Sequence, residues 1–126
     1  MRAIRSAGNA STERRLTNLL ARRAFSGWRL HEDALPGNPD FYFAAARLAV
    51  FIDGCFWHGC PRCGHIPKTN VAYWRNKILR NKKRDAFITR KLRSLGFSVL
   101  RFRECQLKRT PDKCVNRLMR TVRARR

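Results

Sequence analysis

Three of the five cysteines and two of the three histidines lie in one short stretch, CFWHGCPRCGH, at residues 55–65. Within it, Cys60 and Cys63 form the C-x-x-C pattern that presents two thiolates to one tetrahedral ion. The alternative is that these cysteines are small buried hydrophobic residues, but proline, arginine and glycine around the C-x-x-C are unusual in a core strand. The sequence therefore predicts a structural zinc site with four sulfur ligands, which are Cys55, Cys60, Cys63 and Cys105, with His65 as a substitute ligand.

Only eight acidic residues stand against 29 lysines and arginines, so each carboxylate needs a reason. Asp40 opens one expected strand, and the neighbouring strand ends beside it at Ile52 and Asp53. Acidic oxygens at adjacent strand ends form the magnesium sites with which nucleases activate water and stabilise the leaving oxygen. The pattern predicts such a site at Asp40.

Two further side chains could move or orient a proton. His58 follows Cys55 by three residues and is a candidate proton-transfer group, with a structural role as the alternative. Asp85 either orients that histidine or pairs with a neighbouring lysine or arginine, and its basic NKKRD context favours the ion pair.

The net charge of +21 indicates a polyanionic partner, because neutralising phosphates releases counterions and increases affinity. A solvated basic surface, a ribosome-like role and a membrane-surface role are the alternatives. The chain has neither an apolar run long enough to span a bilayer nor a signal-peptide pattern, and its odd cysteine count argues against a disulfide framework. We expect a cytoplasmic protein that binds nucleic acid.

The elements that must position these groups follow from hydrophobic periodicity and capping residues. We expect a flexible basic arm over residues 1–10 and one domain over 11–126, of mixed α/β class with a small central sheet flanked by helices. The expected elements are a helix over 11–25 capped by Ser11, a strand near 28–31, a hairpin over 40–45 and 47–53, a helix from about 72 to 95, a strand over 97–104 and a helix from Pro111 onward.

The helices expected over 72–95 and from Pro111 onward each have an apolar side. In the helix over 72–95, it consists of Trp74, Ile78, Phe87, Ile88, Leu92 and Leu95, with a possible kink near Asn81 and an end at Gly96. In the last, it consists of Val115, Leu118, Met119 and Val122, with Cys114 assigned to the core.

Four motifs, LPGNPDF, VFIDGCFWHGC, YWRNKILRNKKRD and LGFSVLRFREC, resemble in order and spacing those of the very short patch repair (Vsr) endonucleases. The resemblance runs from MRAI near the start through REC at residues 103–105. It implies a restriction-endonuclease-like core and a magnesium-dependent nick on the 5′ side of the thymine in a T:G mismatch, the product of 5-methylcytosine deamination.

The resemblance also implies roles for single residues. Asp40 is similar to the metal-binding aspartate, and Ile52 matches a position that offers its backbone carbonyl to the metal. His58 matches the catalytic histidine and Asp85 its acidic partner. Glu13 matches a glutamate of the first helix that supports the active site.

In the same family, aromatic residues wedge into the base stack beside the mismatch, where unstacking costs least. The matching residues are Phe56, Trp57 and Trp74, although core packing is the alternative for Trp74. The resemblance further implies a zinc shell from the four cysteines and an N-terminal segment that grips DNA from the opposite groove. The zinc-ligand spacing, the short arm and Arg103, where the family has an aromatic residue, depart from the pattern.

The expected partner is therefore mismatched duplex DNA, bound by a monomer and with mismatch-repair proteins as possible further partners. Two alternatives stay open. The first is a restriction-like or defence nuclease that cuts paired or modified DNA, because one scaffold can host several specificities. The second is a zinc-containing module that binds DNA without cutting it.

Overall fold

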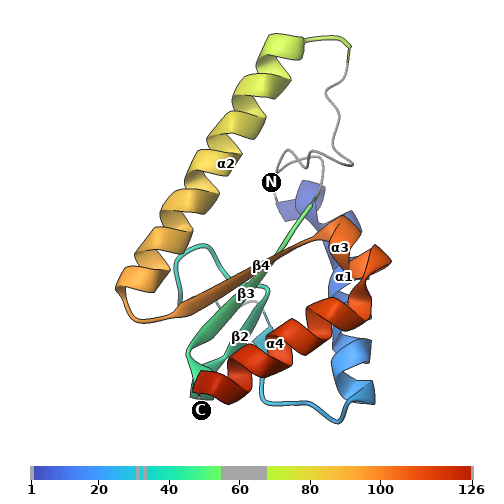
Figure 1. The fold of residues 1–126 in the computed structure, drawn as a ribbon. Coiled ribbons are helices and arrows are strands. Elements are labelled where there is room, and N and C mark those ends of the chain that lie inside the picture. The colour runs from blue at the N-terminus through green and yellow to red at the C-terminus, as the bar shows by residue number, and fades with distance from the viewer. Residues whose placement is uncertain (1, 31, 33, 55–67, 126) are drawn as a thin grey trace.

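The computed structural model describes residues 2–30, 32, 34–54 and 68–125, with side chains from Thr12 onward. In this part of the chain, helices lie on both faces of one small sheet (Figure 1). The mixed α/β class expected from the sequence is confirmed. The elements are α1 (Arg2–Arg22), β1 (Arg29–Leu30), β2 (Phe41–Phe43), the 3-10 helix η1 (Ala44–Ala46), β3 (Leu48–Asp53), α2 (Val71–Ser94), β4 (Ser98–Arg103), α3 (Glu104–Arg109) and α4 (Pro111–Arg125).

The sheet has the strand order β1-β2-β3-β4. The predicted hairpin is confirmed, because β2 pairs antiparallel with β3 through Phe41 opposite Val50. Its connection is η1 followed by Arg47, which has φ 49° and ψ 48° and so reverses the chain. β3 and β4 are parallel, and α2 lies between them in the sequence, as expected because parallel neighbours need a long crossover.

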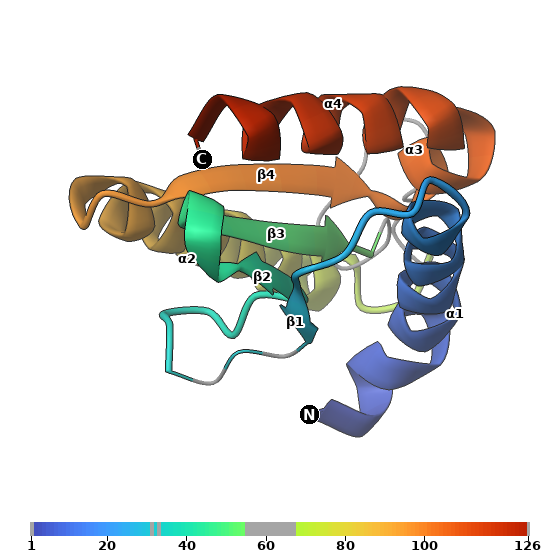
Figure 2. The ribbon, with the colours of Figure 1, turned by 90° about the horizontal axis from the view of Figure 1, so that it is seen from below.

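β3 is buried on both faces, which explains its nearly continuous apolar sequence. Leu48, Val50 and Ile52 belong to the larger core, which α1 and α4 cover. Ala49 and Phe51 belong to a smaller cluster with α2 on the other face (Figure 2). The two faces of the sheet therefore carry cores of different size.

The apolar side predicted for the last helix is confirmed, and all four of its residues are buried, as is Cys114. Burial raises the pKa of the Cys114 thiol above its ordinary value, although a hydrogen bond with Thr110 and the charge of Arg117 act in the opposite direction. A thiol that stays protonated behaves as a small hydrophobic residue, which agrees with its assignment to the core.

The start predicted for the first helix is wrong, the possible break in the long helix is absent, and one short helix was not predicted. α1 begins at Arg2 and not at Ser11, because no proline interrupts residues 2–11 and several of them favour helix. α2 is continuous at Asn81, since it contains neither proline nor glycine. The short α3 was not expected; the Arg103 N–H donates a hydrogen bond of 2.7 Å to Oε1 of Gln106 at its start.

The apolar side of α2 is also narrower than expected. Ile78 and Leu92 are buried, whereas Phe87 is 55% and Leu95 51% exposed. Only a narrow strip of the α2 surface therefore packs against the rest of the protein. Among the described residues, no helix is both long and apolar enough to cross a membrane.

Truncation of α4 tests the larger core. Leu118 is fully buried in it, so Leu118→Ala is expected to lower the free energy of unfolding by about 2–5 kcal/mol. The measurement is urea unfolding followed by circular dichroism. The control is Leu79→Ala, at a residue that is 50% exposed, with an expected change within about 0.5 kcal/mol. Equal losses in the two variants would contradict this assignment of the core.

Candidate active site

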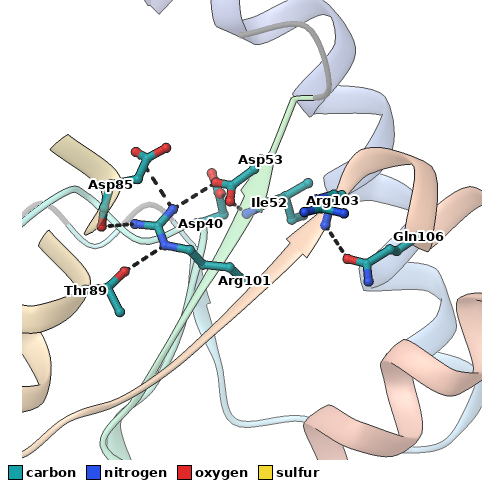
Figure 3. Close-up of polar contacts among 8 residues, drawn as sticks. All are labelled: Asp40, Ile52, Asp53, Asp85, Thr89, Arg101, Arg103 and Gln106. Carbon is teal, nitrogen blue, oxygen red and sulfur yellow. Dashed lines mark hydrogen bonds and ion pairs between the residues drawn. The ribbon is translucent and has the colours of Figure 1, made fainter. Parts of the chain in front are cut away.

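Asp40 and Ile52, which the sequence predicts to be neighbours, are in direct contact. Asp40 precedes β2 and is 2% exposed. Its Oδ2 accepts a hydrogen bond of 2.7 Å from the Ile52 N–H near the end of β3 (Figure 3). This bond fixes a buried carboxylate at the carboxyl end of the strand.

The backbone of Ile52 offers a second oxygen on the same side. In an antiparallel pair, the N–H and the carbonyl of one residue face the same neighbouring strand. The N–H of Ile52 faces Asp40, so its carbonyl faces that side too. The register of β2 and β3, continued beyond Phe41, puts Pro39 opposite Ile52, and proline has no N–H with which to extend the ladder.

The Pro39 carbonyl instead accepts a hydrogen bond of 3.2 Å from the Glu32 N–H, so the chain leaves the β3 ladder at this point. A buried carboxylate and a backbone carbonyl thus converge where pairing ends. These are oxygen donors of the kind that Mg²⁺ binds. The two residues present fit a magnesium site.

Gly37 allows the loop before Asp40 to pack closely against its neighbours. Gly37 has φ +80°, and a Cβ there would lie 2.7 Å from Cγ2 of Ile88 and 3.2 Å from Cε1 of Phe51. The loop is therefore packed closely against α2 and β3, and any side chain at position 37 would push it away. The LPGNPD motif is thus a connector of fixed shape.

A charged cluster lies on the α2 side of the same strand ends, around Arg101 of β4. Nη1 of Arg101 lies 2.9 Å from Oδ1 of Asp53 and 3.9 Å from Oδ1 of Asp85. Its Nε donates to Oγ1 of Thr89 at 2.8 Å, and its Nη2 to the Asp85 carbonyl at 3.3 Å (Figure 3). The guanidinium lies over the Phe51 ring, 4.2 Å from its centroid.

An ion pair of Asp85 was one of the two roles predicted for it, and the pair is present. One partner is Arg101 on β4, which lies outside the NKKRD segment. The sequence reading missed Arg101 as a site residue. The available signal was an arginine between Leu100 and Phe102 in a strand that is covered on both faces, because a charge there requires partners.

The remaining described candidates lie on the helices. Glu13 is half-buried on α1, which packs against β3. Trp74 is half-buried near the start of α2 and meets Tyr73 edge to face, with ring centroids 5.0 Å apart. Cys105 is buried on α3, directly after β4. The N-terminal half of α2 extends beyond the ends of β3 and β4 (Figure 1).

The other predicted site residues fall outside the described part of the chain: Cys55, Phe56, Trp57, His58, Cys60, Cys63 and His65. Within residues 2–54 and 68–125, apart from the gaps at 31 and 33, no three histidine, cysteine or acidic side chains are grouped as metal ligands. Most zinc ligands proposed from the sequence lie between these segments, so the zinc site stays a prediction.

The hydrogen bond of Asp40 yields a stability prediction. Asp40→Ala leaves the buried Ile52 N–H without its carboxylate partner and is expected to lower the free energy of unfolding by about 1–3 kcal/mol. Asp40→Asn keeps an acceptor oxygen, so its loss should be smaller by about 1 kcal/mol or more. Urea unfolding of both variants measures the difference; a carboxamide that costs as much as the alanine would contradict the role of this bond.

Comparison with known proteins gives the family. A family model for DNA mismatch endonuclease Vsr matches residues 1–63, half of the 126-residue chain. The type II nicking enzyme V.NaeI of Lentzea aerocolonigenes is 48% identical over 69 residues, which cover 55% of this chain and 42% of that protein.

Two other relatives match over more of their length. The type II nicking enzyme V.XorIIP of Xanthomonas oryzae pv. oryzae is 38% identical over 109 residues, which cover 85% of this chain and 78% of that protein. DNA mismatch endonuclease Vsr of Escherichia coli (strain K12) is 37% identical over 110 residues, with 86% and 69% covered. The chain belongs to the Vsr family of DNA mismatch endonucleases.

Proposed function

We propose that this protein is a magnesium-dependent DNA endonuclease that nicks one strand on the 5′ side of the thymine in a T:G mismatch. Membership of the family supports the endonuclease activity, and the name of the E. coli relative supports the mismatch. The observation that carries the proposal is the buried Asp40 carboxylate bonded to Ile52 at the strand end. A buried acid in a chain of net charge +21 has a clear use as a metal ligand beside a phosphate.

Asp40 and the carbonyl of Ile52 would hold the magnesium ion. When bound there, the ion lowers the pKa of a water molecule and stabilises charge on the leaving oxygen. The Ile52 N–H keeps the Asp40 carboxylate in one orientation. A magnesium ion that binds there would therefore not have to immobilise this side chain. In this proposal His58 accepts the proton of the attacking water, Asp85 orients His58, and Glu13 supports the site from α1.

DNA binding would use the basic surface. The exposed face of α2 beside the proposed site carries many cations and hence suits a phosphate backbone: Arg75, Arg80, Lys82, Lys83, Arg84 and Arg90. Trp74, Phe56 and Trp57 would wedge beside the mismatch, where a weakened base step opens most easily. The edge contact from Tyr73 supports the Trp74 ring in such a position. The helical N-terminal segment would grip the opposite groove.

A structural zinc ion held by Cys55, Cys60, Cys63 and Cys105 belongs to the same proposal, with His65 as a substitute ligand. Cys105 lies two residues beyond the end of β4, the strand that carries Arg101. Zinc bound to it would tie the segment after β3 to the end of β4. We further propose a restriction-endonuclease-like core and a monomer that acts in the cytoplasm, at the nucleoid when bound to DNA.

Paired DNA is the second candidate substrate, because V.NaeI and V.XorIIP are named as nicking enzymes without reference to a mismatch. A restriction-like enzyme would cut the paired duplex as well as the mismatched one. A DNA-binding module would cut neither. Mismatch-repair proteins stay possible partners if the protein is a mismatch endonuclease.

The nicking assay uses an end-labelled duplex with one T:G mismatch, beside its paired counterpart, with and without Mg²⁺. We expect cleavage of one strand 5′ of the thymine. Asp40→Asn should reduce the rate by about 100-fold or more, because it removes the charge that holds the metal. Asp112→Asn is the control, since Asp112 is 80% exposed and pairs only with Arg23 among the described ion pairs. Equal cutting of the paired duplex would contradict mismatch specificity.

Zinc is tested by metal analysis of the purified protein. We expect about one zinc ion per chain, and a large loss of zinc in Cys105→Ala. Cys114→Ala is the matched control, because Cys114 is also buried but lies within the α4 core. A wild-type protein without zinc, or equal zinc in the two variants, would contradict the proposed ligand set.

A further inference from the structure

Arg101 connects three elements at the proposed active site. It lies on β4, contacts Phe51 and Asp53 of β3, and reaches Asp85 and Thr89 of α2. Its side chain is 20% exposed, and those of Asp53 and Asp85 are 15% and 17% exposed. A guanidinium in so sheltered a position is stable only where its donors and its charge are matched, as they are here.

The two contacts on α2 are one helical turn apart. Asp85 and Thr89 are at positions i and i+4, so they face β4 from the same side of the helix. Nε of Arg101 bonds to Oγ1 of Thr89, and Nη2 bonds to the Asp85 carbonyl, so the planar fork defines both the distance and the rotation of this turn. A lysine, with a single ammonium, could not make all of these contacts.

Near Asp85, the apolar packing of α2 comes mainly from Ile88, which is partly buried against the smaller cluster. Leu92, near its C-terminal end, is fully buried, whereas Phe87 and Leu79 are 55% and 50% exposed. At the level of Asp85, the polar contacts of Arg101 therefore add to the packing of Ile88 in holding α2 against the sheet. The same Arg101 is bonded to Asp53, which follows Ile52 directly.

We infer that Arg101 is the positioning residue of the active site, which holds Asp85 of α2 at a fixed place relative to the strand end that carries Asp40 and Ile52. The inference rests on the proposed nuclease function and extends it. Arg101 acts through Asp85 and need not touch DNA. A side chain that merely stabilised the fold would change the free energy of unfolding without any selective effect on the cutting step.

The experiment measures single-turnover nicking of the T:G duplex at saturating protein, together with the Kd for DNA and the unfolding midpoint. The variants are Arg101→Met, Arg101→Lys, Asp85→Asn and the double variant Arg101→Met/Asp85→Asn. Arg123→Met is the matched control, since it removes the same charge from an exposed position on α4, across the sheet from α2. Asp40→Asn reports on the proposed function.

We expect Arg101→Met to lower the nicking rate constant by about 10- to 100-fold, the range usual for groups that orient a catalytic residue. The Kd for DNA should stay within about 3-fold of that of Arg123→Met, because both variants lose one positive charge. Arg101→Lys should recover part of the rate. The double variant should be no slower than Asp85→Asn alone, because Arg101 has nothing left to position.

A wild-type rate in Arg101→Met would overturn the inference, and so would two losses that multiply in the double variant. If Asp40→Asn is inactive in that case, the proposed function stands. If the wild-type protein and Arg123→Met nick no duplex, the proposed function fails and the inference fails with it. Should Arg101→Met not fold, Arg101→Lys and Thr89→Val take its place; each is expected to slow nicking by several-fold, and unchanged rates in both would overturn the positioning role.

Discussion

The hydrogen bond from the Ile52 N–H to the Asp40 carboxylate determines how the loop before β2 and the end of β3 fit together. It satisfies a backbone donor whose partner in a continued ladder would be the Pro39 carbonyl, which accepts from the Glu32 N–H instead. It also commits a buried acid to the strand end, although burial of a carboxylate is costly without such partners. Close packing of the Gly37 loop against Ile88 and Phe51 supports the same arrangement from behind.

The two faces of the sheet serve different purposes. On one face, α1 and α4 close a core of large apolar side chains, which provides most of the burial. On the other, α2 meets the sheet through a small apolar cluster at one end and the Arg101 contacts toward the other. The larger core and the Arg101 contacts thus lie on opposite faces of the sheet. The candidate site lies near the end of β3, where the Ile52 N–H contacts Asp40 and Asp53 contacts Arg101 (Figure 3).

The sequence was most informative where local chemistry and tertiary packing agree. The hairpin of β2 and β3 and the α4 helix, with Pro111 in its first turn, were predicted for that reason. α1 was predicted too short because the favourable cap at Ser11 says nothing about what precedes it. Six-residue α3 is too short for periodicity to reveal. The partners of Arg101 lie 48 residues away at Asp53 and 12 at Thr89, so only the folded chain brings them together.

The backbone origin of the Ile52 oxygen has a consequence for how this site could diverge among relatives. Any apolar side chain that fits the core would leave the carbonyl at position 52 in place, so substitutions there carry little information about chemistry. Pro39 contributes no atom to the proposed metal site, yet a residue with an N–H at that position could extend the strand pairing and occupy the same carbonyl. Replacing Pro39 could therefore lower activity although no metal ligand is changed. Position 39 would then be restricted to proline among relatives even though its side chain binds nothing.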